Sequence, residues 1–227
     1  MDILNMIKII AAIISLIIAF TVGIIVLRLN PDNWLNRWFF LFFISIALGF
    51  LLYSIYHFIY TGSYTKDSDI IIPLMITAQI FFNFIPISLV MTVLILEKYK
   101  KVAMSLKYLG TMFALLIIMS IGYFILPPTL NEDKYADKII DTETEFAVQI
   151  IANVLRIALF AYVVYKYVII TRKIEIETKR RVQWFFMGII LAIIGLIINL
   201  IGAIIFEIAA LIIIDVGMVL IFKGFLI

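Results

Sequence analysis

A long apolar stretch, residues 145–172, carries three polar side chains on one side of a predicted helix. Gln149, Asn153 and Arg156 follow one another at spacings of four and three residues, which places them on a single helical face. An arginine inside membrane hydrocarbon is costly unless it faces protein or water and has a partner for its charge. This stretch is therefore the first place where we look for chemistry.

The sequence offers two acids as partners for this arginine, Glu207 and Asp215, both in the last apolar segment. Counted from the ends of their helices, Arg156 and Asp215 lie at nearly the same depth, so we expect them to form an ion pair. Glu207 lies about two turns further out, where it is either a second acceptor or an interface residue. We expect Asn153 to hydrogen-bond in the same cluster. The pair either serves a mechanism or only holds two helices together.

Other polar residues fall at similar depths in other predicted helices: Gln79 and Asn83 in the third, and Asn199 near the end of the sixth. Together with the arginine cluster they predict one polar chamber in the outer half of the bundle, above an apolar, closed inner half. The alternative is that these amides are interhelical fasteners of modest worth, about 0.6–2 kcal/mol each.

The helices that position these residues are indicated by composition. Hydrophobic residues make up 65% of the chain and charged residues 15%, whereas soluble domains have about 25% charged residues. A chain of 227 residues has room for seven spans of about 20 residues. We therefore predict an all-α, seven-transmembrane-helix bundle that forms a single domain, with a turn near Gly202. The predicted spans are 4–27, 35–60, 70–96, 108–126, 146–171, 183–201 and 205–225.

The orientation of the bundle follows from the distribution of lysine and arginine. Twelve of these residues flank the predicted inner ends of the helices, and four lie on the other side. Cytoplasmic loops carry the excess of positive charge, so the N-terminus is predicted outside and the C-terminus in the cytoplasm. The four outer residues are Lys8, Lys66, Lys134 and Lys138.

Enzyme chemistry finds little support in the sequence. With one histidine and no cysteine, the chain lacks the ligands of the usual zinc sites, and it contains no HExxH or GxSxG motif. The last helix has no mid-membrane lysine for a Schiff base, because Lys223 lies at its cytoplasmic end. We expect no enzyme, no metal and no cofactor, and we read the basic loops as topology signals without a nucleic-acid partner.

Two segments resemble a known family. Residues 30–54, NPDNWLNRWFFLFFISIALGFLLYS, are similar to the NxxNRxFALFLLxLALWxLGY pattern of the seven-helix N-terminal regions of membrane sensor histidine kinases. Residues 180–197, RRVQWFFMGIILAIIGLI, resemble the basic start of the sixth helix in those regions. The resemblance implies a sensory domain that detects a signal outside or within the bilayer. No coiled linker or kinase follows the last predicted helix, so the output is expected from a separate subunit.

Three functions are compatible with this pattern. The first is a stand-alone sensor or receptor-like protein of the cell membrane, which binds a small or lipidic ligand in the outer-half chamber and signals through a cytoplasmic or membrane partner. The second is a small transporter, or an integral membrane subunit of a larger complex, that uses Arg156, Asp215 and Glu207. The third is a scaffold without a ligand. The loops 97–107 and 172–181 are the expected partner surface, with membrane lipids as the other contacts.

Overall fold

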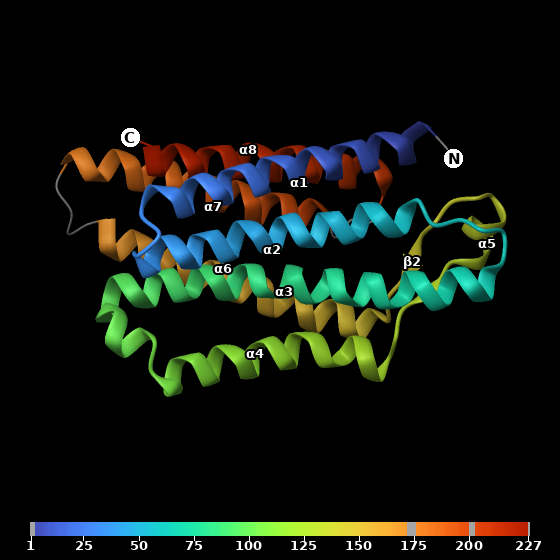
Figure 1. Cartoon of the computed structure of the whole chain (residues 1–227), viewed down its shortest axis with the longest axis horizontal. Helices are drawn as coiled ribbons and strands as arrows, with labels where there is room; N and C mark the ends of the chain where they lie inside the picture. Colours follow the sequence, from blue (N-terminus) through green and yellow to red (C-terminus); the bar gives the residue numbers. More distant parts are fainter. Residues whose placement is uncertain (1–2, 172–175, 200–202, 227) are drawn as a thin grey trace.

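The computed structural model describes residues 3–171, 176–199 and 203–226, and it is a bundle of long helices (Figure 1). The elements are α1 (Ile3–Leu29), α2 (Trp34–His57), α3 (Tyr64–Ala103), α4 (Leu106–Ile125), β1 (Thr129–Leu130), α5 (Glu132–Ala136), β2 (Thr142–Glu143), α6 (Phe146–Thr171), α7 (Ile176–Asn199) and α8 (Ile204–Leu226). The prediction of an all-α bundle is confirmed.

The helices have the length and apolarity of membrane spans. In the described part of the chain, six of them meet both conditions: α1, α2, α3, α4, α6 and α8. The apolar part of α7 is shorter and covers Gln183–Asn199. The protein is therefore a multi-pass membrane protein. Exposed isoleucine, leucine and phenylalanine side chains on the outside of α1, α4 and α6 agree with contact to lipid.

Helix α3 is much longer than expected, since its 40 residues begin at Tyr64 rather than near residue 70. The segment 64–69 was predicted as part of a loop, but Asp67 lies in the first turn of the helix, where a carboxylate is favoured by the helix dipole. The helix also continues through Pro73 and Pro86. The expected turn at Gly202 lies outside the described residues.

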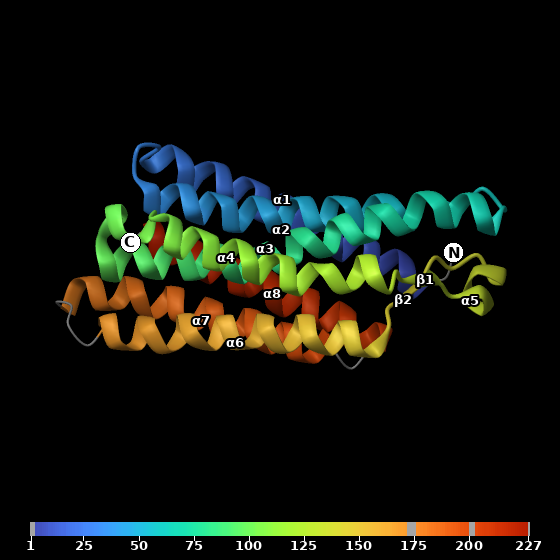
Figure 2. The same cartoon turned by 90° about the horizontal axis from the view of Figure 1, so that it is seen from below.

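Helices α7 and α8 approach each other closely along a row of small residues. A Cβ atom added to Gly188 would lie 2.5 Å from the Gly217 carbonyl oxygen, and one added to Gly195 would lie 3.0 Å from the Ala210 carbonyl oxygen. Small residues of this kind let helix backbones pack tightly in a membrane. Figure 2 shows the two helices running side by side. This packing fixes one wall of the interior.

A small cap covers one end of the bundle, formed by residues 129–143 (right side of Figure 1). Its two strands pair antiparallel, with Thr129 opposite Glu143 and Leu130 opposite Thr142. Helix α5 lies between them. The sequence indicated only an acidic loop here, because two-residue strands leave no periodic signal.

The cap is attached to the start of α3 by a buried carboxylate. Asp67 accepts hydrogen bonds from the Thr61 backbone N–H (2.8 Å), the Thr61 hydroxyl (2.7 Å) and the Tyr135 hydroxyl (2.6 Å). The Tyr64 hydroxyl donates to the Leu130 carbonyl at 2.9 Å. Burial of the phenol, together with its bond to the carboxylate, raises the pKa of Tyr135 to about 12. The cap is thus anchored by side chains from three separate segments.

Candidate binding site

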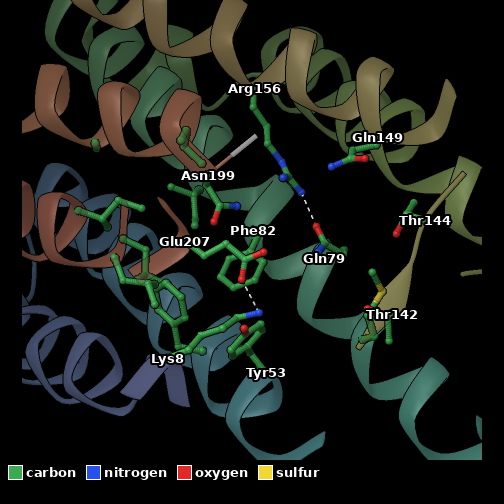
Figure 3. Close-up of a pocket in the computed structure, with 18 of the residues that line it drawn as sticks. Lys8, Tyr53, Gln79, Phe82, Thr142, Thr144, Gln149, Arg156, Asn199 and Glu207 are labelled. Atoms are coloured by element: carbon green, nitrogen blue, oxygen red, sulfur yellow. Dashed lines mark hydrogen bonds and ion pairs between the residues drawn. The ribbon is translucent and has the colours of Figure 1, made fainter. Parts of the chain in front are cut away.

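A cavity of about 280 Å³ lies between the helices beneath the cap. Helices α1, α2, α3, α6, α7 and α8 all contribute to its wall, and the strand β2 with its neighbours closes one side. Helix α4 contributes no lining residue. Figure 3 shows the polar part of this space, with labelled side chains from several helices around it.

The lining residues recur at helical spacing on α2, α3, α6, α7 and α8, whereas α1 contributes Lys8 alone. On α8 they are Glu207, Leu211, Ile214, Met218 and Ile221, separated by four and three residues in turn. Such spacing keeps one stripe of each helix turned inward. From the first to the last of these positions α8 rises by about 21 Å, at about 1.5 Å per residue. The cavity is therefore elongated along the bundle.

The character of the wall changes along this length. The end near the cap is lined by polar groups: Lys8, Tyr53, His57, Gln79, Asp141, Thr142, Thr144, Gln149, Arg156, Asn199 and Glu207. The opposite end is lined by Phe42, Ile46, Ile85, Phe160, Leu211, Met218 and Ile221. The sequence predicts that the half of the bundle away from the cap is closed and packed. In the structure the cavity extends into this half, between apolar side chains.

Arg156 is the most buried cation of this wall, with 8% of its surface exposed. Its Nε donates to Asn83 Oδ1 at 2.8 Å, one terminal nitrogen to Asn153 Oδ1 at 3.0 Å, and the other to Gln79 Oε1 at 2.8 Å. The partners belong to α3 and to α6 itself, and Figure 3 shows the guanidinium directed at Gln79. Hydrogen bonds to a charged group are worth about 1.5–3 kcal/mol each, so three carbonyl oxygens hold this group firmly.

The expected ion pair between Arg156 and Asp215 is wrong. Among the described residues Arg156 forms no ion pair, and its hydrogen bonds go to neutral amides. Asp215 instead lies beside the Ser15 hydroxyl of α1, and its Oδ1 is buried without a hydrogen-bond partner in the described structure. Equal depth along two helices did not bring the residues together, because the acid faces α1 while the arginine faces α3. The hydrogen bond expected for Asn153 in the arginine cluster is present.

Glu207 is also not an acceptor for Arg156. It forms an ion pair with Lys8, which ties the first helix to the last at the polar end of the cavity. The side chains are 12% and 22% exposed for the lysine and the glutamate. The Lys8 ammonium also lies 5.5 Å from the ring centre of Tyr53 on α2, within the range of a cation–π contact.

The predicted polar cluster is thus divided into three places. Arg156, Gln79, Gln149, Asn199 and Glu207 line the cavity. Asn83 and Asn153 are absent from the lining and hold the arginine from behind, and Asn83 also donates to the Met119 carbonyl at 3.0 Å. Asp215 lies apart, against α1.

Several lining residues were missed by sequence reasoning. The sequence places Lys8 only on the outer side of the membrane and gives no role to His57, which also lines the cavity. The His57 ring stacks on Tyr56, and its Nδ1 lies 2.8 Å from the Tyr53 carbonyl oxygen. The signal for Lys8 was available, because a lysine and a glutamate of opposite charge fall at the same end of two predicted helices. The cap residues Asp141 and Thr142 gave no such signal.

The described residues supply no metal centre, since no group of three or more histidine, cysteine, aspartate or glutamate side chains is placed to hold an ion. What the cavity offers is a fixed cation, several amides and hydroxyls, and an apolar continuation. These groups can bind and orient a molecule. Comparison with protein-family models and with curated proteins gave no match to this chain.

Proposed function

We propose that the protein is a sensor or receptor-like protein of the cell membrane that binds a small amphipathic ligand in this cavity. The observation that carries the proposal is the cavity itself, which is polar at the cap end, apolar at the other, and enclosed by most of the long helices. Ligand pockets are usually concave and mostly apolar, with a few convergent polar groups that fix orientation.

The wall of the cavity suggests how binding produces a signal. Its lining stripes belong to five helices, α2, α3, α6, α7 and α8, which continue to the end of the bundle opposite the cap. A ligand that contacts these helices differently in two arrangements shifts the balance between them. In the proposed orientation the helix ends opposite the cap lie in the cytoplasm. A separate partner protein binds there and responds to the change in their arrangement. The resemblance to kinase sensor regions supports this reading, as do the basic residues between 97 and 107.

The proposal includes seven membrane crossings, with the N-terminus outside and the C-terminus in the cytoplasm. Six described helices have the length of a membrane span. The apolar part of α7 covers 17 residues, which equals the lower limit of about 17 residues for a transmembrane helix. The excess of lysine and arginine lies at the end of the bundle away from the cap, which supports a cytoplasmic location of that end.

The experiment uses the absence of cysteine from the chain. Spin labels are placed on cysteines at the exposed positions Arg28 and Lys101, at the ends of α1 and α3. The distance distribution is measured in phosphatidylcholine nanodiscs with and without an equal mixture of laurate, lauryl alcohol and laurylamine, which share a twelve-carbon chain and carry an anionic, a neutral and a cationic headgroup. We expect the mixture to change this distribution. A control pair within α1, Ile17 and Arg28, stays unchanged.

No change with the mixture, at concentrations that saturate the bilayer, would refute ligand sensing by this cavity. The transporter alternative makes a different prediction for Phe160, a buried residue of the apolar end. In a transporter, a cysteine at this position reacts with a membrane-impermeant reagent from the cytoplasmic side once the mixture is added. In a sensor the apolar end of the cavity stays closed to the cytoplasm, and this cysteine remains unreactive.

A further inference from the structure

One positive charge in the cavity wall has no acidic partner among the described residues. Among the described lining residues, Glu207 is paired with Lys8, and Asp141 is paired with Lys134 of the cap. Arg156 belongs to neither pair, and its partners are three amide oxygens and the neutral Tyr123 phenol. The acid that we expected to neutralise it, Asp215, is not part of the lining. The wall therefore presents one uncompensated positive charge to the interior.

Uncompensated cations inside membrane proteins are costly, and they commonly mark ligand or ion sites. Here the guanidinium is also fixed in position, because both of its terminal nitrogens and Nε are hydrogen-bonded. Arginine is well suited to bind carboxylate and phosphate groups, since its planar N–H donors match their geometry. Gln149 and Asn199 lie on either side of it in Figure 3 and offer further polar contacts.

We infer that the ligand is an anionic amphiphile, with a carboxylate, phosphate or sulfate headgroup at Arg156 and an apolar chain directed toward Phe160, Met218 and Ile221. The inference rests on the proposed function and names the class of its ligand. The elongated shape of the cavity favours a chain over a compact molecule. A cationic amphiphile is disfavoured because its headgroup would be repelled by the arginine. A small soluble anion would leave the apolar end unfilled.

The first test needs no variant. The spin-labelled Arg28–Lys101 pair is titrated separately with laurate, lauryl alcohol and laurylamine, and then with acetate and inorganic phosphate. We expect laurate to change the distances at concentrations roughly tenfold or more below the alcohol, and the amine and the two soluble anions to have no effect. Equal responses to laurate and the alcohol would overturn the anionic headgroup while leaving ligand sensing intact. A response to acetate or phosphate alone would overturn the requirement for a chain.

The second test asks whether Arg156 carries the discrimination. In Arg156→Gln, tritiated laurate bound to nanodiscs, corrected for empty nanodiscs, should fall about tenfold in affinity, while lauryl alcohol is bound as before. Arg156→Lys should keep part of the preference for laurate. The matched control is Arg37→Gln, at a half-buried arginine outside the cavity that pairs with Asp32, and it should leave both affinities unchanged. A purely structural role of Arg156 would lower both affinities together, and that result would overturn the inference. If Arg156→Gln does not fold, the charge series on the unmodified protein still decides it.

Discussion

At the scale of single residues, the buried arginine and the buried aspartate do not form the ion pair that their opposite charges suggest. Arg156 is satisfied by three amide oxygens, and the nearest acid in depth turns its carboxylate toward α1. The helical face of Gln149, Asn153 and Arg156 followed directly from their spacing. The rotation of α8 about its own axis could not be predicted from the sequence. An almost uniformly apolar helix gives no signal for the side that faces the bundle.

The ion pair between Lys8 and Glu207 can be tested by a double-mutant cycle. Lys8→Met and Glu207→Gln should each lower the thermal stability in nanodiscs, because each leaves the other group partly buried and unpaired. Both side chains keep some exposure, so each loss should be below the roughly 3–5 kcal/mol of a fully buried pair. The double variant should recover part of it.

The control for this cycle combines Lys8→Met with Asp215→Asn, on the same two helices but without an ion pair between them. The effects of these two substitutions should add. The same additivity is expected for Arg156→Leu with Asp215→Leu. A recovery of stability in either control, or strict additivity for Lys8 with Glu207, would contradict the pairing seen in the structure.

At the scale of elements, the helices were largely predictable, and their contacts were not. Five predicted spans agree with the helices to within a few residues, because a bilayer-length apolar run leaves little choice. Helix α3 exceeded its prediction because a hydropathy pattern reports the apolar part of a helix and not its polar extensions. The cap depends on single side chains, such as Asp67, that meet residues far along the chain.

The packing of α7 against α8 gives a prediction with an internal control. Gly188→Ala should lower stability by about 1–3 kcal/mol, the usual cost of overpacking, because its new methyl group would lie 2.5 Å from a backbone oxygen of α8. Gly110→Ala on α4 meets nothing within 4 Å, and it should be neutral or slightly stabilising. Thermal unfolding of the two variants measures the difference. Equal effects would show that the two helices are less close than described.

The Tyr135 hydroxyl is one of the groups that attach the cap to the start of α3. Tyr135→Phe removes a donor to Asp67, so the cap should detach more often, and trypsin should cleave faster at the exposed Lys134 and Lys138. Tyr60→Phe is the matched control, since its ring packs on Tyr135 and no hydrogen bond of its hydroxyl is seen among the described residues. Unchanged cleavage of Tyr135→Phe would mean that the bond does not hold the cap.

The same bond makes a pH prediction. Because the pKa of Tyr135 is raised to about 12 in the folded protein, its stabilising effect is complete below the ordinary value near 10 and is lost as the pH rises through 12. The difference in tyrosinate absorbance between the wild type and Tyr135→Phe should therefore appear only as the pH approaches 12. A difference that is complete near pH 10 would contradict the buried position of this phenol.

At the scale of the whole molecule, the two ends of the bundle differ in chemistry. One end carries the cap, the start of α1 and the polar part of the cavity, and the other carries the link between α3 and α4 (Figure 1). The sequence predicted this division from the unequal distribution of lysine and arginine. It could not predict that the cavity extends far from the cap, because a cavity depends on how the stripes of five separate helices face one another.

The orientation of the molecule can be tested with three single cysteines at exposed positions in a chain that has none. Ala136→Cys lies in the cap, Leu106→Cys at the start of α4, and Ala203→Cys before α8. A membrane-impermeant maleimide applied to intact cells should label the first and third, and should label Leu106→Cys only after permeabilisation. None of the substitutions changes a charge, so the charge pattern that sets the orientation is preserved. Labelling of Leu106→Cys alone would reverse the orientation. Failure of Ala203→Cys to react in intact cells, with Ala136→Cys still labelled, would mean that α7 does not cross the membrane.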